Sequence, residues 1–346
     1  MYVCTRKNFK TGVRKMKKMW SVLVHMSHNM WGSYKEPWNL DDETWDKILH
    51  MASEKGYNTI VLDVGDGIMY ESHPEISLEG AWSHARVKKE IKKAADLGLK
   101  IIPKLNFSAS HDVWLGEYER MVSTKIYYKV CRDLIHEVYE VFEQPEYIHL
   151  GMDEENSRLE RRLDFVCYRK GELIWEDLKY LCGCVSETGA KPWIWADFLI
   201  HHPEEFKKHF KGDDVLVSPW QYFAMYEEHF TPIKDNPRDE EYYTSGIFAG
   251  SGIVYVEEDP VCADYRREII PAMEEGFCVV PCVSYFNKNK YNHCDTLRYF
   301  KEKAPDSGVV GFMAAPWKMT TPDNLKNFEE DMNILMDVKK IYYPEN

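Results

Sequence analysis

Residues 41–64 read DDETWDKILHMASEKGYNTIVLDV and contain one complete helix-to-strand unit. Asp41 or Asp42 can cap a helix whose apolar residues recur three and four positions apart, and Gly56 is typical of a helix end. The apolar run at 59–64 follows at once and predicts a strand that is covered on both faces. A helix ended by glycine and followed directly by such a strand is the repeating unit of α/β proteins.

The same unit recurs along the whole chain. Longer helical segments are expected at 118–142, 171–188 and 322–338. Nearly continuous apolar runs predict eight parallel strands, at 22–26, 59–64, 100–105, 147–150, 192–196, 215–219, 277–283 and 309–314. Eight strands that alternate with helices predict a single (β/α)8 TIM barrel. A doubly wound open sheet is the alternative, but no strand is followed by GxGxxG or GxxxxGK[ST], which counts against its nucleotide-binding form.

The 346 residues fit one barrel domain at 20–346, preceded by a basic extension at 1–19. The first 20 residues contain seven basic side chains and no acidic one. After the sixth strand, the segment 222–258 is too long for an ordinary connection and is rich in aromatic and acidic residues. We expect this insertion to form either a lid or subsite wall over the barrel mouth, or a subunit interface; both interpretations stay open, as does a homo-oligomer.

Charge and hydropathy exclude several classes of protein. With 44 basic and 57 acidic side chains the formal net charge is −13, which argues against binding to duplex nucleic acid. No apolar run approaches the 18 residues of a membrane span, and no signal-peptide core is recognisable. Nine cysteines in mostly apolar surroundings predict reduced thiols and a cytoplasmic protein. We expect no cofactor and no metal, because the Cys182/Cys184 and Cys278/Cys282 pairs lack the second pair of a structural zinc site.

The carboxyl ends of the strands are where a (β/α)8 barrel carries its chemistry. The candidate site residues are therefore those that end or follow the predicted strands: Asp63, His111, His149, Asp153, Glu154, Trp195, Asp197, Trp220, Tyr285 and Trp317. Flat aromatic faces combined with a few acids suit sugar rings, whose C–H faces stack on tryptophan and tyrosine. This combination favours glycosidic chemistry with a carboxylic acid as proton donor and a carbohydrate as the binding partner.

Residues 148–154 read IHLGMDE and form the most distinctive segment. The Asp153–Glu154 pair comes directly after a short apolar strand, a position where pairs from a solvated helix surface do not occur. Two like charges this close push at least one pKa upward, as a general acid near neutral pH requires.

The segment from His149 to Glu154 resembles the HxGxDE strand-four signature of glycoside hydrolase family 20, the β-N-acetylhexosaminidases. Residues 97–106, 191–198, 215–220 and 308–317 are similar to further strands of that family, so the resemblance extends over most of the barrel. It implies an exo-acting, retaining enzyme in which the substrate's own acetamido oxygen attacks the anomeric carbon. Asp153 then orients the acetamido group and Glu154 is the acid/base. The lack of a carboxylate at 278–287, after the seventh strand, agrees with a substrate-assisted reaction.

The resemblance also implies roles for other candidates. Trp220, Tyr285 and Trp317 would form the wall of a sugar pocket, and Asp63 or Asp66 would join His111 and Glu154 in a relay. The chain departs from the family in having no arginine after the first strand and no Pro-Gly-His turn after the third.

Alternative interpretations remain at this point. For His149 the sequence favours a core histidine over a substrate contact. Asp197 can also be a helix cap, and buried packing is the alternative for the aromatic residues. A barrel that binds sugar without hydrolysing it, and a different barrel glycosidase or metal-assisted hydrolase using Asp63, Asp153 and histidines, are the competing functions.

Overall fold

The computed structural model describes residues 17–32, 34–155, 163, 167, 169–222, 225–226, 260–286, 288–289 and 291–344. Most of the predicted 222–258 insertion and residues 1–16 of the predicted extension lie outside the described residues. Where the extension ends, β1 begins at Met19, and the Lys18 ammonium group donates to the carbonyl of Val309 at 2.8 Å.

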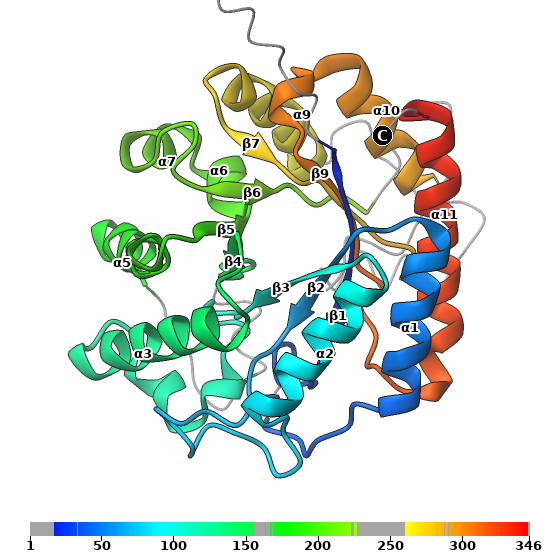
Figure 1. Ribbon diagram of the computed structural model, residues 1–346. Coiled ribbons are helices and arrows are strands. Elements are labelled where there is room, and N and C mark those ends of the chain that lie inside the picture. Colours follow the sequence, from blue (N-terminus) through cyan, green and yellow to red (C-terminus); the bar gives the residue numbers. More distant parts are fainter. Residues whose placement is uncertain are drawn as a thin grey trace, which may run out of the picture.

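Parallel strands form the centre of the molecule and helices surround them (Figure 1). The strands follow the order β7-β6-β5-β4-β3-β2-β1-β9-β8. Their bounds are β1 Met19–His25, β2 Thr59–Asp63, β3 Lys100–Lys104, β4 Tyr147–His149, β5 Lys191–Trp195, β6 Leu216–Ser218, β7 Cys278–Val279, β8 Cys282–Val283 and β9 Gly311–Ala314. Every predicted strand is present, so the predicted α/β barrel is confirmed.

The barrel closes through its seventh strand, which Pro281 divides in two. β7 pairs with β6, whereas β8 pairs with β9. Single bridges from Val279 to Val309 and from Trp220 to Cys282 join each half to the other neighbouring strand. The continuous strand predicted at 277–283 is thus wrong in its middle, because a proline has no N–H to donate to the ladder.

The helices lie outside the strands, with α1 beside α11 and α3 beside α5 (Figure 1). The α-helices are α1 Asp42–Lys55, α2 His84–Asp96, α3 Lys125–Val141, α5 Glu172–Thr188, α6 Asp197–His201, α7 Pro203–His209, α9 Pro260–Glu274, α10 Asn292–Lys303 and α11 Leu325–Tyr342. The described residues also form 3-10 helices at η1 Val113–Met121, η4 Asp306–Gly308 and η5 Pro322–Asn324. No helix in the described part of the chain is long and apolar enough to span a membrane.

Local capping chemistry sets several helix boundaries. Asp41 accepts from the backbone N–H of Thr44 at 2.7 Å and caps α1, and Gly56 ends that helix with a φ of 87°. The single helix expected at 118–142 is instead η1 followed by α3. Thr124 has extended backbone angles and its hydroxyl accepts from the N–H of Tyr127, so a new helix starts there.

Two apolar layers make up the core. The larger lies between strands and helices and includes Val22 and Ile60; the smaller fills the barrel interior and includes Leu23, Val61 and Trp193. Successive side chains of a strand point to opposite faces. A residue two positions after an interior residue therefore faces the interior as well. The last residues of β1, β2, β3, β4 and β5 therefore face the barrel interior, at the end where the site lies: His25, Asp63, Lys104, His149 and Trp195.

Candidate active site

A strained turn after β4 carries Asp153 and Glu154. Gly151, Met152 and Glu154 have φ angles of 72°, 67° and 53°. A Cβ on Gly151 would lie 2.1 Å from Oδ1 of Asn106, so only glycine fits beside that side chain. Left-handed angles at two non-glycine residues are unfavourable and persist where the surroundings hold them, which is typical of functional sites.

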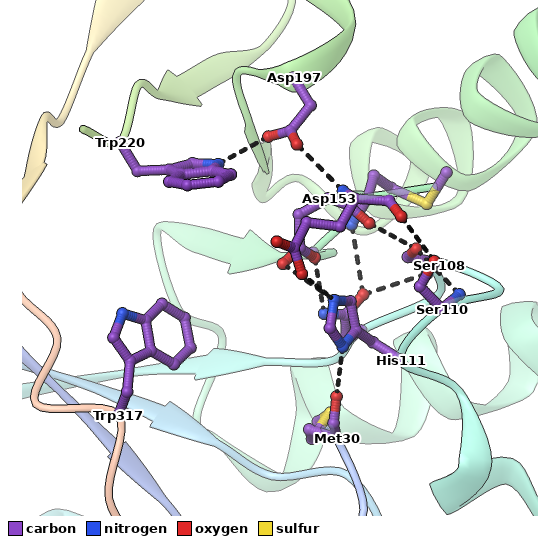
Figure 2. A network of polar contacts seen from close by, with 12 residues as sticks. Met30, Ser108, Ser110, His111, Asp153, Asp197, Trp220 and Trp317 are labelled. Carbon is purple, nitrogen blue, oxygen red and sulfur yellow. Dashed lines mark hydrogen bonds and ion pairs between the residues drawn. The ribbon is translucent and has the colours of Figure 1, made fainter. Parts of the chain in front are cut away.

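Three polar residues after β3 hold this turn (Figure 2). The amide of Asn106 donates to Oδ1 of Asp153 at 2.8 Å. The hydroxyls of Ser108 and Ser110 donate to the backbone carbonyls of Asp153 and Glu154, each at 2.6 Å. The sequence places all three residues after the third predicted strand, where the chemistry is expected, without singling them out as site residues. Their signal is the polar alternation at 106, 108 and 110, directly after an apolar strand.

His111 contacts both carboxylates. Its Nε2 lies 3.1 Å from Oε2 of Glu154 and 3.4 Å from Oδ2 of Asp153. Its Nδ1 lies 2.9 Å from the carbonyl oxygen of Met30 (Figure 2), which can only accept, so Nδ1 carries a hydrogen. The Nε2 contact with Glu154 therefore needs a proton, on the imidazole or on the carboxyl group, and this pair can hold and deliver one.

Asp197 joins the acid pair to the aromatic wall. One oxygen accepts from the backbone N–H of Glu154 at 3.0 Å and the other accepts from Nε1 of Trp220 at 2.8 Å (Figure 2). Removal from water, together with the nearby negative charge of Asp153, raises the pKa of Asp197 from 3.8 to about 7. Asp197 is the first residue of α6, but the N-cap position is Ala196 and no side chain caps this helix, so the alternative role of Asp197 as a helix cap is wrong.

Replacing Asp197 by asparagine should change how stability depends on pH. Between about pH 4 and 7 the folded protein keeps a proton on Asp197 that the unfolded chain has released, so this group makes the free energy of unfolding fall as the pH rises. Asparagine does not titrate, so the Asp197→Asn variant should gain stability relative to the wild type from pH 5 to pH 7.5 in urea unfolding. Asp96→Asn, at an exposed aspartate of α2, is the matched control. Parallel stability curves for wild type and Asp197→Asn would contradict the shifted pKa.

Aromatic side chains lie on one side of the carboxylates. Figure 2 shows Trp220 and Trp317 facing Asp153 and His111. Trp317 has a φ of 51°, and its Nε1 donates to the hydroxyl of Tyr222 at 3.0 Å. The rings of Trp220 and Tyr222 are 5.3 Å apart. These rings form an aromatic wall beside the carboxylates, and flat aromatic faces of this kind can stack on sugar.

The structure places Tyr285 differently from the other wall candidates. Its ring packs against the ammonium group of Lys288, 4.8 Å from the ring centroid. The next residue, Phe286, contacts Tyr222 at 5.7 Å. The sequence places Tyr222 after the sixth strand without singling it out as a site residue. It favours Tyr285 over Phe286, and a one-residue change in where the loop turns exchanges these two neighbours.

Asp63, His149 and Trp195 lie in the barrel interior. Asp63 contacts His25 and Lys104, and Nδ1 of His149 accepts from the N–H of Gly151 at 3.0 Å. Asp66 accepts instead from Ser27 and Asn29, both at 2.7 Å, and so joins the loops after β1 and β2. The expected relay was to join Asp63 or Asp66 to His111. In the structure Nδ1 of His111 contacts the carbonyl oxygen of Met30 instead.

A buried arginine binds Glu155, the residue that follows the acid pair. Arg169 makes two 2.5 Å bonds to the carboxylate of Glu155, one 3.1 Å bond to Asp177 on α5 and one 3.1 Å bond to the carbonyl of Phe107. These bonds tie the residue after Glu154 to the loop that carries His111. Nothing in the spacing of these residues predicts the network.

A metal ion has a set of ligand atoms available at the same place. One oxygen or nitrogen from each of His111, Asp153 and Glu154 lie within 4.8 Å of one another. Imidazole and carboxylate groups are ligands that zinc and other transition metals accept. A metal there would displace the proton that Nε2 of His111 now shares with Glu154.

Comparisons with known proteins place the fold. No family model and no curated protein matches the chain. Among solved structures it is similar to the GH20 catalytic module of the pneumococcal exo-β-D-N-acetylglucosaminidase StrH, at 16% identity and a TM-score of 0.59, covering 95% of this chain and 84% of that one.

Two Streptomyces proteins are also similar. For the GH20 β-N-acetylhexosaminidase from Streptomyces coelicolor A3(2), the identity is 13% and the TM-score 0.61, covering 92% of this chain and 63% of that one. For a mutant Streptomyces plicatus β-hexosaminidase in complex with its product GlcNAc, the identity is 12% and the TM-score 0.59, covering 96% of this chain and 68% of that one. At these identities the likeness concerns the fold, and this chain has the barrel fold of glycoside hydrolase family 20.

Proposed function

We propose that the protein is an exo-acting, retaining glycosidase that removes a terminal β-linked N-acetylhexosamine by substrate-assisted catalysis. The observation that carries the proposal is the geometry of Asp153, Glu154 and His111. Two adjacent carboxylates are held at the carboxyl end of β4, and a histidine contacts both of them. The fold shared with named hexosaminidases supports the proposal, as does the HxGxDE resemblance.

The reaction follows from the position of each proton. In the first step Glu154 donates its proton to the glycosidic oxygen while the bond from that oxygen to C1 breaks. The acetamido oxygen of the substrate forms a bond to C1 from the opposite face. Asp153 accepts a hydrogen bond from the acetamido N–H and stabilises the positive charge of the resulting oxazolinium ion.

In the second step a water molecule attacks C1 and Glu154 takes one of its protons. The bond between C1 and the acetamido oxygen breaks, so the configuration at C1 is retained. The proton taken from this water restores the protonated form of Glu154, and His111 orients that carboxyl group through its 3.1 Å contact. The aromatic wall stacks on the sugar ring. A carbohydrate is thus the proposed binding partner, and a cytoplasmic location stays part of the proposal.

Hydrolysis of chromogenic glycosides tests this function. The 4-nitrophenyl β-N-acetylglucosaminide and β-N-acetylgalactosaminide should be hydrolysed with initial formation of the β-anomer, as observed by proton NMR. The matched β-glucoside has a hydroxyl in place of the acetamido group and lacks the internal nucleophile, so it should react at least about a hundredfold more slowly. Equal rates for the glucoside and the N-acetylglucosaminide, or initial release of the α-anomer, would exclude the proposed mechanism.

A metal-assisted hydrolase is the second candidate, favoured by the three possible ligand atoms of His111, Asp153 and Glu154. A metal bound there would activate water instead of leaving Glu154 as a proton donor. Treatment with a chelator separates the two candidates. Substrate-assisted activity should persist after chelation, whereas activity that is lost and then restored by one added divalent metal would favour the second.

A further inference from the structure

A single buried guanidinium group connects three parts of the chain that surround the acid pair. The side chain of Arg169 is 1% exposed, and those of its partners Glu155 and Asp177 are 3% and 0% exposed. Nε and Nη2 donate to the two carboxylate oxygens of Glu155, and Nη1 donates to Asp177 on α5. Nη2 also donates to the carbonyl of Phe107, after β3. A guanidinium has five N–H groups, and four hydrogen bonds are made here.

Stability alone does not account for such a network. Removing charges from water is costly, and replacing a buried ion pair by apolar side chains of similar volume is often neutral or stabilising. What an arginine adds is direction, because its planar fork has N–H groups at fixed angles and binds a carboxylate through two parallel bonds. Arg169 therefore fixes the positions of its three partners relative to one another.

Glu155 links Arg169 to the proposed acid. Glu154 directly precedes Glu155 and has a φ of 53°, which is unfavourable for a residue with a side chain. A backbone conformation of this kind persists only where neighbouring contacts hold it. Ser110 and Asp197 bind the carbonyl and the N–H of Glu154. Arg169 holds the residue that follows, so all three contacts set the direction of the Glu154 side chain.

Phe107 links the same guanidinium group to His111. Phe107 lies four positions before His111, in the loop after β3. Arg169 thus binds both of the segments that meet where Nε2 of His111 lies 3.1 Å from Oε2 of Glu154. A shift of either segment would change this contact.

Asp177 anchors the guanidinium group to the helices outside the barrel. It lies on α5 and also accepts from the hydroxyl of Ser123 at 2.5 Å and from the hydroxyl of Tyr128 on α3. A site supported from helices is held more precisely than one supported from loops alone. Arg169 therefore connects the loops of the acid pair to a rigid part of the fold.

We propose that Arg169 is a positioning residue for Glu154, and that it fixes the direction of this carboxyl group toward His111 and the glycosidic oxygen. The inference rests on the proposed function, in which Glu154 protonates that oxygen. Asp153 has a separate support, the 2.8 Å bond from Asn106. Loss of Arg169 therefore impairs proton transfer more than it impairs stabilisation of the oxazolinium ion or binding of the sugar.

Two substitutions at Arg169 test the proposal by steady-state kinetics. Arg169→Lys keeps the charge and loses the fork, whereas Arg169→Met loses both. With 4-nitrophenyl β-N-acetylglucosaminide, kcat should fall about tenfold in Arg169→Lys and about a hundredfold in Arg169→Met, because small displacements of a reacting group have effects of this size. KM should change much less. The loss in kcat/KM should be much smaller for the 2,4-dinitrophenyl glycoside, whose leaving group needs little help from a proton donor.

A purely structural role of Arg169 predicts a different result. Arg169→Lys would then lower the melting temperature and, through a smaller fraction of folded enzyme, reduce the rates on both leaving groups by the same factor, which would overturn the proposal. Wild-type kinetics in both variants would overturn it too, while leaving the proposed function intact. The control is Arg132→Met on α3, where a 45% exposed arginine pairs with Glu187 at 2.8 Å. This variant should keep the wild-type kcat/KM on both substrates.

A further variant, Glu155→Gln, covers the case in which Arg169→Met does not fold. It breaks the ion pair and keeps the size of the side chain, so it should show the same dependence on the leaving group. The double variant Arg169→Lys/Glu155→Gln should lose little more than the larger of the two single losses, since both changes remove the same interaction. Fully additive losses would contradict a shared positioning role.

Hydrogen exchange separates failure of this inference from failure of the proposed function. If the wild type hydrolyses no N-acetylhexosaminide, the proposed function fails, but NMR can still observe the turn after β4. The N–H groups of Met152 and Glu154 bind Asn106 and Asp197. Their exchange should be at least about tenfold faster in Arg169→Lys, with exchange in β1 and β2 unchanged. Wild-type exchange rates at both N–H groups would reject the positioning role.

Discussion

Replacing Glu154 by glutamine should lower kcat/KM for 4-nitrophenyl β-N-acetylglucosaminide by about a hundredfold to ten-thousandfold, the usual contribution of a general acid. Glutamine keeps the size of the side chain and can still contact His111, but it has no proton to give to the leaving oxygen. The loss should depend on the leaving group. The 2,4-dinitrophenolate group leaves with little need for a proton. The first step of the variant should therefore be much less impaired on a 2,4-dinitrophenyl glycoside.

The proton donor can therefore be identified from two substrates and one variant. Circular dichroism and the melting temperature of Glu154→Gln serve as the folding control, since Ser110 and Asp197 bind the backbone of Glu154 and not its carboxylate. An equal loss on both leaving groups would show that Glu154 does not protonate the glycosidic oxygen. Wild-type activity in Glu154→Gln would mean that the reaction takes place elsewhere in the barrel.

Replacing Asp153 by asparagine should lower kcat by about a hundredfold to a thousandfold, with a much smaller effect on KM. Asparagine can keep the 2.8 Å bond from Asn106 through its own oxygen, so the turn after β4 should stay in place. What is lost is the negative charge beside the acetamido group, which matters most when the oxazolinium ion forms. Steady-state kinetics on the N-acetylglucosaminide, with separate values for kcat and KM, measure this change.

Asn106→Ala provides the comparison for Asp153→Asn. It removes the amide that orients Asp153 but leaves the charge, so its effect on kcat should be clearly smaller. A variant Asp153→Asn that changes only KM would indicate a residue that binds substrate without stabilising charge. The substrate-assisted mechanism would then lose its main electrostatic contribution.

The loss of charge at residue 153 should also affect Asp197. The negative charge of Asp153 is one cause of the raised pKa of Asp197, second to removal from water. Uncharged asparagine at position 153 should therefore move the pKa of Asp197 back toward its ordinary value. The fall in the free energy of unfolding between pH 4 and 7 should then be smaller in Asp153→Asn than in the wild type.

Sequence by itself determined the alternation of strands and helices, the caps of α1 and the place of the Asp153–Glu154 pair. These features depend on residues close together in the chain: apolar runs, Asp41 and Gly56 at the ends of a helix, and an acidic pair directly after a strand. The parallel strands of a barrel have all their carboxyl ends at the same end of the barrel. Most site candidates therefore follow from the same pattern of apolar runs.

Only the tertiary structure decided how these residues are paired. His111 binds the carbonyl of Met30, 81 positions away, and Asp197 joins Glu154 to Trp220 across three different strand ends. The division of the seventh strand at Pro281 and the choice of Phe286 over Tyr285 in the aromatic contacts are of the same kind. The physical reason is that hydrogen bonds and ring contacts depend on distances of a few ångströms between separate loops, and no periodicity along the chain encodes those distances.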